Sequence, residues 1–128
     1  MNLFETNYCE INYLEDSKTL VQEWKKFCMP EEFRTAQNKT VELFKAHNCV
    51  NFISDTTNAG VLKKEETEWA AKTITPQLVE SGMKEINFIV PNNVFAQMTL
   101  DNLTKQEQGG LPLNFFPNVT DALNHINK

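Results

Sequence analysis

The fold is decided by the stretch CVNFISDTTNAGVLKKEETEWAAKTITPQLVESGMKEINFIVP, residues 49–91. It begins with CVNFIS (Cys49–Ser54) and ends with INFIVP (Ile86–Pro91), and each of these short apolar runs is typical of a buried strand. Between them, from about Lys64, apolar residues recur at helical spacing until Gly82 ends the helix. Strands that alternate with a helix predict parallel pairing through a right-handed crossover.

The chain before this stretch predicts a hairpin and a helix. The segments YCEINYL (Tyr8–Leu14) and TLVQEW (Thr19–Trp24) alternate apolar and polar residues around the polar turn EDSK, which favours an antiparallel pair. Pro30 and the acidic pair Glu31-Glu32 are typical of a helix start. We therefore expect an opening β-hairpin followed by a helix.

The chain after it predicts a helix, a strand and a last helix. Asn92-Asn93 is typical of a helix start, LNFF (Leu113–Phe116) reads as a short edge strand, and a helix begins near Asn118. The sequence thus predicts one α/β domain over residues 1–128. Its mixed sheet has four or five strands, with parallel central strands and about four helices.

Composition limits the partners and the compartment. The 128 residues include 17 acidic and 12 basic side chains, a net charge of −5, which disfavours nucleic acid and anionic membranes as partners. No stretch approaches the roughly 20 apolar residues that span a bilayer, and no secretory signal is visible. Three cysteines without a C-x-x-C pair fit a reducing cytoplasm.

Polar residues follow two parallel strands at the edge where α/β sheets usually bind ligands. Turns and helix caps use the same residue types, so turn chemistry is the competing interpretation. VFAQM (Val94–Met98) adds flexible apolar side chains that can repack around a ligand or partner, with core filling as the competing interpretation. The candidate ligand- or partner-binding residues are Asp55, Thr56, Thr57, Asn58, Asn92, Phe95 and Met98.

No residue pattern indicates catalysis, a metal or a cofactor. Two histidines and three scattered cysteines have no zinc spacing, and Cys49 with His47 is a poor nucleophile pair. A hydrolase that uses Asp55 with a following threonine lacks a base with a shifted pKa. The acidic pairs at helix starts are interpreted as solvated ends, and His125 as a surface residue. We expect no enzyme activity, no metal and no cofactor.

The whole chain resembles the STAS-like (anti-sigma-factor-antagonist-like) fold, in its small bacterial single-domain branch named together with CRAL-TRIO lipid-transfer domains. The resemblance rests on Glu23-Trp24, Asp55, Trp69 and IVPNNVFAQM (residues 89–98). It implies a regulatory or ligand-sensing module. In phospho-regulated antagonists a serine at a helix start, within Asp-Ser-Ser-Gly, accepts phosphate. Here that start reads KKEET, and Thr67 is the nearest hydroxyl.

Two functions follow from these observations. The first is a non-enzymatic regulatory or interaction module that presents the turn after the Ile53 strand and the following helix to an unknown protein partner, with a homodimer as one arrangement. The alternative is a small carrier or sensor that binds an apolar or amphipathic ligand such as a lipid.

Overall fold

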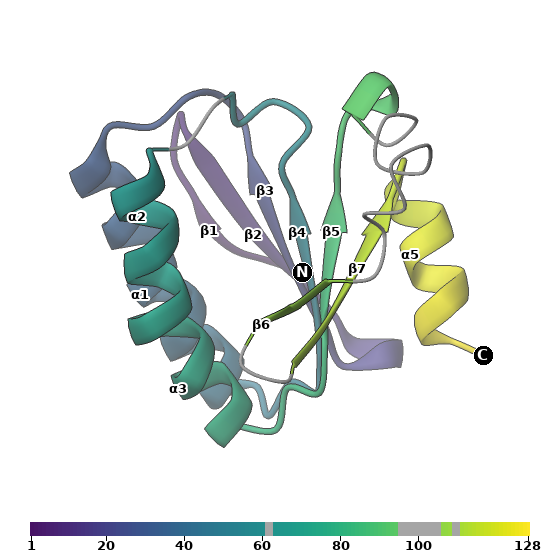
Figure 1. The fold of residues 1–128 in the computed structure, drawn as a ribbon. Helices are drawn as coiled ribbons and strands as arrows, with labels where there is room; N and C mark the ends of the chain where they lie inside the picture. Colours follow the sequence, from purple (N-terminus) through teal and green to yellow (C-terminus); the bar gives the residue numbers. More distant parts are fainter. Residues whose placement is uncertain (61–62, 95–105, 109–110) are drawn as a thin grey trace.

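The computed structural model describes residues 1–60, 63–94, 106–108 and 111–128, and for 106–108 only the backbone. Seven strands form one sheet in the order β1-β2-β3-β4-β5-β7-β6 (Figure 1). Their bounds are β1 Asn2–Glu5, β2 Cys9–Leu14, β3 Thr19–Trp24, β4 Asn51–Asp55, β5 Ile86–Ile89, β6 Gln106–Gln108 and β7 Leu111–Phe116.

The predicted α/β class, the opening hairpin and the parallel centre are confirmed. Strands β2 and β3 pair antiparallel across the Glu15–Ser17 turn, and β3, β4, β5 and β7 are all parallel. The predicted count of four or five strands is wrong. Each end carries an additional antiparallel strand, β1 and β6, and with four and three residues these strands are too short to give an alternating pattern. Strand β7 is therefore not the edge.

Helices lie on both faces of the sheet (Figure 1). On one face lie α1 (Pro30–Ala46), α2 (Lys64–Trp69) and α3 (Thr75–Glu80), and on the other lies α5 (Val119–Ile126). The predicted helix starts near Pro30, Lys64 and Asn118 are confirmed. Pro30 is the first residue of α1, and the Asn118 side chain accepts a hydrogen bond from the Asp121 amide at 2.8 Å.

The segment Ala70–Ile74 between α2 and α3 is a π-helix. The amide of Thr75 donates to the carbonyl of Ala70, five residues back. Pro76 follows directly, and a proline has no amide proton and crowds the preceding turn. The wider turn therefore accommodates Pro76 within the helix, and Gly82, with φ of +112°, ends the helix as expected.

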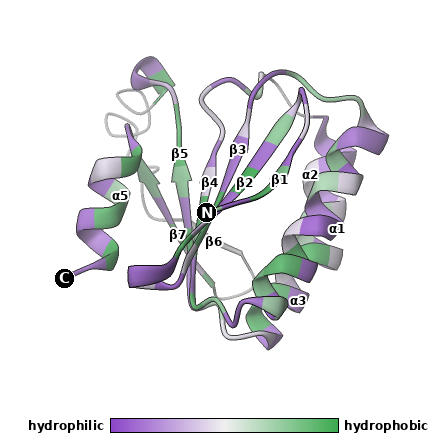
Figure 2. Cartoon of the chain, turned by 180° about the vertical axis from the view of Figure 1, so that it is seen from behind, coloured by the Kyte–Doolittle hydropathy of each residue, from purple (hydrophilic) through white to green (hydrophobic). Residues whose placement is uncertain are grey.

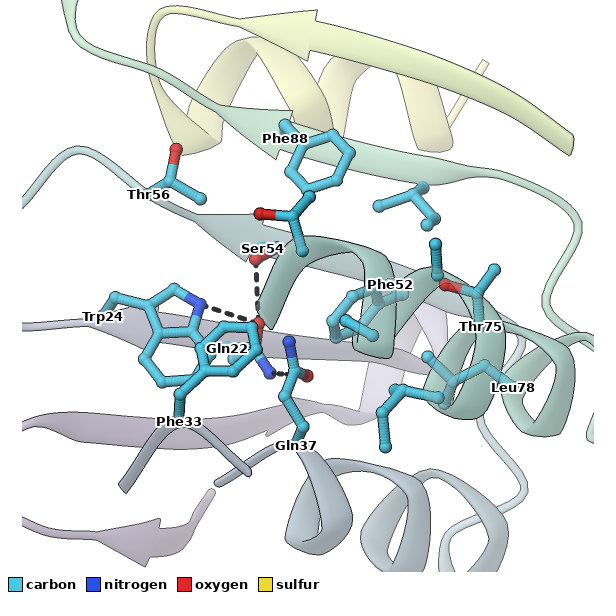
Figure 3. Close-up of a pocket in the computed structure, with 15 residues that line it drawn as sticks. Gln22, Trp24, Phe33, Gln37, Phe52, Ser54, Thr56, Thr75, Leu78 and Phe88 are labelled. Carbon is cyan, nitrogen blue, oxygen red and sulfur yellow. Dashed lines mark hydrogen bonds between the residues drawn. The ribbon is translucent and has the colours of Figure 1, made fainter. Parts of the chain in front are cut away.

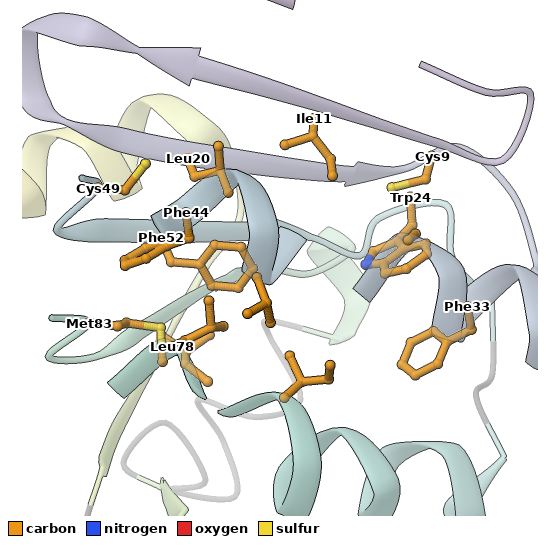
Figure 4. Packing of buried hydrophobic residues seen from close by; sticks show 14 of the residues in the cluster. Cys9, Ile11, Leu20, Trp24, Phe33, Phe44, Cys49, Phe52, Leu78 and Met83 are labelled. Atoms are coloured by element: carbon orange, nitrogen blue, oxygen red, sulfur yellow. The ribbon is translucent and has the colours of Figure 1, made fainter. Parts of the chain in front are cut away.

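Two hydrophobic clusters lie on opposite sides of the sheet. The larger joins the sheet to α1 and α3, with Leu20, Phe52, Phe44 and Leu78 among its fully or almost fully buried side chains (Figure 4). The smaller lies under α5. The larger cluster positions the cavity described below.

The antiparallel end of the sheet keeps one face polar. Hydrophobic and hydrophilic residues alternate along β2 (Figure 2). Cys9, Ile11 and Tyr13 are buried, whereas Glu10 and Asn12 between them are partly exposed. This is the pattern of a sheet with one solvated face.

Candidate functional site: a cavity between the sheet and helices

A cavity of about 110 Å³ lies between the sheet and the helices α1 to α3 (Figure 3). Its floor comes from β3, β4 and β5, and its roof from α1 and the π-helical segment with the helices on either side of it. The lining residues are Gln22, Trp24, Phe33, Gln37, Phe52, Ser54, Thr56, Thr67, Ala70, Ala71, Ile74, Thr75, Leu78, Ile86 and Phe88.

Gln22 organises the polar side of the cavity. Its Nε2 donates to Gln37 Oε1 at 2.9 Å and to Thr40 Oγ1 at 2.8 Å. Its Oε1 accepts from Trp24 Nε1 at 2.9 Å and from Ser54 Oγ at 2.8 Å (Figure 3). Gln22 is 1% exposed, and its amide makes all four of these hydrogen bonds. A saturated buried network of this kind fixes side-chain positions.

An aromatic wall closes one end of the cavity. Trp24 stacks on Phe33 with ring centroids 5.2 Å apart, and Trp69 meets the edge of Phe33 at 6.4 Å. The guanidinium of Arg34 lies 4.7 Å from the Trp69 ring centroid. The wall therefore ties β3, α1 and α2 together.

An ion pair joins the two helices above this wall. Arg34 donates to both carboxylate oxygens of Glu66, from Nε at 2.8 Å and from Nη2 at 3.1 Å. Glu66 is 6% exposed, so its interpretation as a solvated helix end is wrong. Hydrogen bonding from Arg34 lowers the pKa of Glu66 below its ordinary value.

The predicted turn residues divide between the two faces of the sheet. Asp55 Oδ1 accepts from the amide of Thr57 at 3.1 Å and from its hydroxyl at 2.7 Å, an Asx turn in which Asn58 is exposed. Thr56 instead lines the cavity, and its hydroxyl donates to the Ile89 carbonyl at 2.7 Å. These contacts fit the competing interpretation of Asp55 and Thr57 as turn chemistry.

The other candidates are more scattered. Thr67 is exposed, lines the cavity and donates to the Lys63 carbonyl at 3.2 Å. Asn92 is exposed in a helical turn that begins at that residue. Phe95 and Met98 lie outside the described residues. Thr56 and Thr67 are thus the two candidates that the structure brings to one site.

Three carboxylates lie side by side on the polar face of the sheet. Glu23 pairs in register with Glu10 on β2 and with Asp55 on β4. Burial raises the pKa of Glu23, and the charges of Asp55 and Glu10 raise it further. Among the described residues, no three His, Cys, Asp or Glu side chains are placed to hold a metal ion.

The surroundings of the three cysteines and of His125 indicate structural rather than catalytic roles. All three cysteines are buried and reduced, and burial raises the pKa of Cys9 to about 12 and of Cys49 to about 11. Such thiols carry almost no thiolate at neutral pH, which disfavours Cys49 as a nucleophile. His125 is only half-buried but not a free surface residue, because its Nε2 lies 2.9 Å from Glu85 Oε1. Its ring also contacts Phe116 at 5.5 Å.

Sequence reasoning missed the organising residues of the cavity. Leu20, Gln22 and Trp24 occupy alternate positions of β3, and the apolar neighbours indicate that this side faces inward. A glutamine in that register is a signal for a buried polar network. Gln37 carried no such signal, because it is half-buried beside the apolar stripe of α1.

Comparison of the chain with protein-family models, with curated proteins and with solved structures gave no match. The STAS-like resemblance therefore rests on the residues quoted from the sequence. None of the helices in the described part of the chain is long and apolar enough to cross a membrane.

Proposed function

We propose that this protein is a non-enzymatic regulatory module that senses a small apolar ligand. The ligand would bind in the cavity between the sheet and helices α1 to α3, called here the Gln22 cavity after the residue that orders its polar side. The observation that carries the proposal is the cavity itself: a partly enclosed, mainly apolar space whose polar groups are already ordered by Gln22. Small-molecule sites are typically apolar hollows with a few well-placed polar groups.

The cavity size favours a compact ligand over a lipid. Its volume of about 110 Å³ is well below the roughly 300–1,000 Å³ of sites for drug-sized molecules. A dry engineered cavity of about 150 Å³ binds benzene or xenon. An acyl chain would require the helices to move away from the sheet.

The chemistry of the lining favours binding over catalysis. Ser54 is its most deeply buried hydroxyl and donates to an amide oxygen, which is not a base. The lining contains no ionisable side chain among the described residues. General acid–base chemistry would need one.

The π-helical segment connects the cavity to the surface. Ala70, Ala71 and Ile74 line the cavity, whereas Lys72 and Thr73 between them are exposed. Segments of this kind often occur at functional sites. We propose that ligand occupancy is read by a partner through this exposed side, as the regulatory class of function requires.

The test compares two matched Ala→Leu variants. Ala71→Leu fills the cavity, whereas Ala46→Leu adds the same side chain at an exposed position of α1. Cyclopentane should shift the Trp24 indole NMR signal in the wild type and in Ala46→Leu but not in Ala71→Leu. A signal that never shifts, or that shifts equally in all three proteins, would contradict the proposal.

A second candidate is a protein-interaction module without a ligand, and one observation favours it. Phe27 and Met29 are 50% and 56% exposed in the loop between β3 and α1. Phe27 also lies against the turn at Gly60, where an added Cβ would be 3.5 Å from its ring. Two exposed apolar side chains in one loop, of which Phe27 lies against the Asp55–Gly60 turn, are consistent with a contact surface, either for a partner or for a second copy.

Sedimentation and native mass spectrometry distinguish the two candidates. A dimer that the double substitution Phe27→Ser with Met29→Ser dissociates would favour the interaction module. A small-molecule mass retained only under native conditions would favour the sensor.

We propose a reducing cytoplasm as the location of this protein, which fits its three buried free cysteines. Phosphorylation of Thr67 is a further proposal from the resemblance, and its exposed hydroxyl is accessible for it.

A further inference from the structure

We infer that the ligand is a compact, uncharged molecule with one hydrogen-bond acceptor, and that Gln37 Nε2 donates to this acceptor. This inference rests on the proposed function, because it names the chemistry of the molecule that the cavity would bind. Three properties of the lining lead to it: its volume, its neutrality and the engagement of its donors.

The volume sets the size. Benzene has six non-hydrogen atoms and binds in a dry cavity of about 150 Å³. The Gln22 cavity, at about 110 Å³, therefore suits a molecule of roughly five or six non-hydrogen atoms.

The lining excludes a charged ligand. Its polar side chains are amides, hydroxyls and one indole, all of them neutral. The nearest described ion pair on the roof, Arg34 with Glu66, is already bidentate. A charged ligand would lose its hydration without gaining a counter-ion, which is strongly unfavourable.

The strand donors of the cavity are already engaged. Both N–H bonds of Gln22 are used, on Gln37 and Thr40, and the indole N–H of Trp24 and the hydroxyl of Ser54 both donate back to Gln22. A ligand acceptor placed against this floor would displace an existing hydrogen bond.

Two threonine hydroxyls are also engaged. The Thr56 hydroxyl donates to the backbone carbonyl of Ile89, and the Thr67 hydroxyl donates to the backbone carbonyl of Lys63. The side chains of Thr56 and Thr67 therefore offer the ligand apolar methyl groups and hydroxyls whose protons are already donated.

Gln37 is different. Its Oε1 faces Gln22, so its Nε2 points the other way, and no described residue accepts a hydrogen bond from this nitrogen. The side chain is half-buried on α1, one turn after Phe33, and Figure 3 shows its amide beside the Gln22 network. Since Gln22 fixes the oxygen, the nitrogen is a pre-oriented donor at the cavity wall.

The experiment measures how Gln37→Leu changes the binding of two probes. Cyclopentane and cyclopentanone have the same ring, and only the ketone accepts a hydrogen bond. Dissociation constants come from NMR titration of the Trp24 indole signal. We expect Gln37→Leu to weaken cyclopentanone about threefold to tenfold, the effect of one neutral hydrogen bond, and to leave cyclopentane within about twofold.

The matched control is Gln77→Leu. Gln77 lies on α3 outside the cavity, and its Nε2 donates to the Thr73 carbonyl. This variant should bind both probes as the wild type does. The cation cyclopentylammonium should bind none of the three proteins.

Gln37→Leu also removes an acceptor from Gln22. A second variant is therefore needed to distinguish loss of the donor from a local change in packing. Gln37→Glu keeps an oxygen for Gln22 Nε2 and loses the donor, and the half-exposed position tolerates its charge. It should weaken cyclopentanone as Gln37→Leu does.

The outcomes separate the inference from the proposed function. Selective loss of the ketone in both Gln37 variants supports the inference. Equal weakening of both probes, or tight binding of the ammonium ion, overturns the inference and leaves the cavity as a binding site. Failure of both probes to bind the wild type overturns the proposed function and the inference with it.

Discussion

The two faces of the central sheet are packed differently against their helices. Under α5, Ile53, Ile89 and Ala122 are at most 2% exposed and form a purely apolar contact. On the opposite face, the neighbouring positions Gln22 and Ser54 are polar and face the cavity. Adjacent residues of one strand thus belong to a dry core on one side and a hydrogen-bonded hollow on the other.

This difference implies that the α5 face mainly stabilises the fold, whereas the cavity face shapes the binding site. An apolar contact under a single helix gains from close packing, and polar atoms there would cost free energy. A buried amide that makes four hydrogen bonds gives up packing density but sets the shape of a hollow. We therefore expect the α5 face to respond to loss of volume, and the cavity face to respond to loss of hydrogen bonds.

The largest effect should follow from Ile53→Ala on the α5 face. This side chain is fully buried, and its truncation should lower the free energy of unfolding by about 3 kcal/mol, from lost burial and the space left behind. Urea unfolding measures it. A loss below about 1 kcal/mol would mean that the α5 face is not closely packed.

The next largest effect should follow from Gln22→Met on the cavity face. Methionine conserves volume but leaves the Trp24 indole N–H without its acceptor, at a cost of about 2 kcal/mol. Ser54→Ala is the control, because it removes one donor and leaves Gln22 bonded to Trp24, and it should cost about 1 kcal/mol. Equal effects of the two variants in urea unfolding would show that Gln22 does not organise this face.

A pH-dependent effect should follow from Glu66→Gln at the roof of the cavity. The folded-state pKa of Glu66 lies below its ordinary value of 4.5, so the carboxylate stabilises the fold above that pH. This contribution is lost as the pH falls through the lowered pKa. The Tm of the wild type should therefore fall more steeply than that of Glu66→Gln as the pH is lowered below about 5. Parallel curves would contradict the ion pair.

The smallest effect should follow from Asp55→Asn, which lies on the same face of β4 as Ile53 but at its partly exposed end. Asparagine can still accept from Thr57, so stability should change by less than about 0.5 kcal/mol. The pKa of Glu23 should fall toward its ordinary value, because the charge of Asp55 raises it. NMR titration of the Glu23 carboxyl measures this, and an unchanged pKa would show that the two carboxylates do not interact.

The sequence predicted the parts of the fold that depend on local patterns. The buried strands near Ile53 and Ile89, the start of α1 at Pro30 and the cap at Asn118 all follow from periodicity or capping chemistry. Strands β1 and β6 do not follow from such patterns, since edge strands of four and three residues owe their pairing to the neighbouring strand rather than to a pattern of their own.

The candidate site was predictable only in part. Thr56 and Thr67 reach the cavity, but Asp55 lies on the other face of the sheet from Ser54, its neighbour in the chain. Besides Trp24, the partners of Gln22 are Gln37, Thr40 and Ser54, which lie 15, 18 and 32 residues away in the chain. Tertiary contacts of this length leave no periodic signal in the sequence.

The most direct test of the account is a crystal structure determined under xenon pressure. Xenon binds dry apolar cavities without needing a specific polar group. We predict electron density for xenon beside Gln22 and Phe88, with none between Ile53 and Ala122 under α5. A cavity filled by side chains, or xenon bound under α5 and absent beside Gln22, would contradict the claim that the cavity face is the binding face.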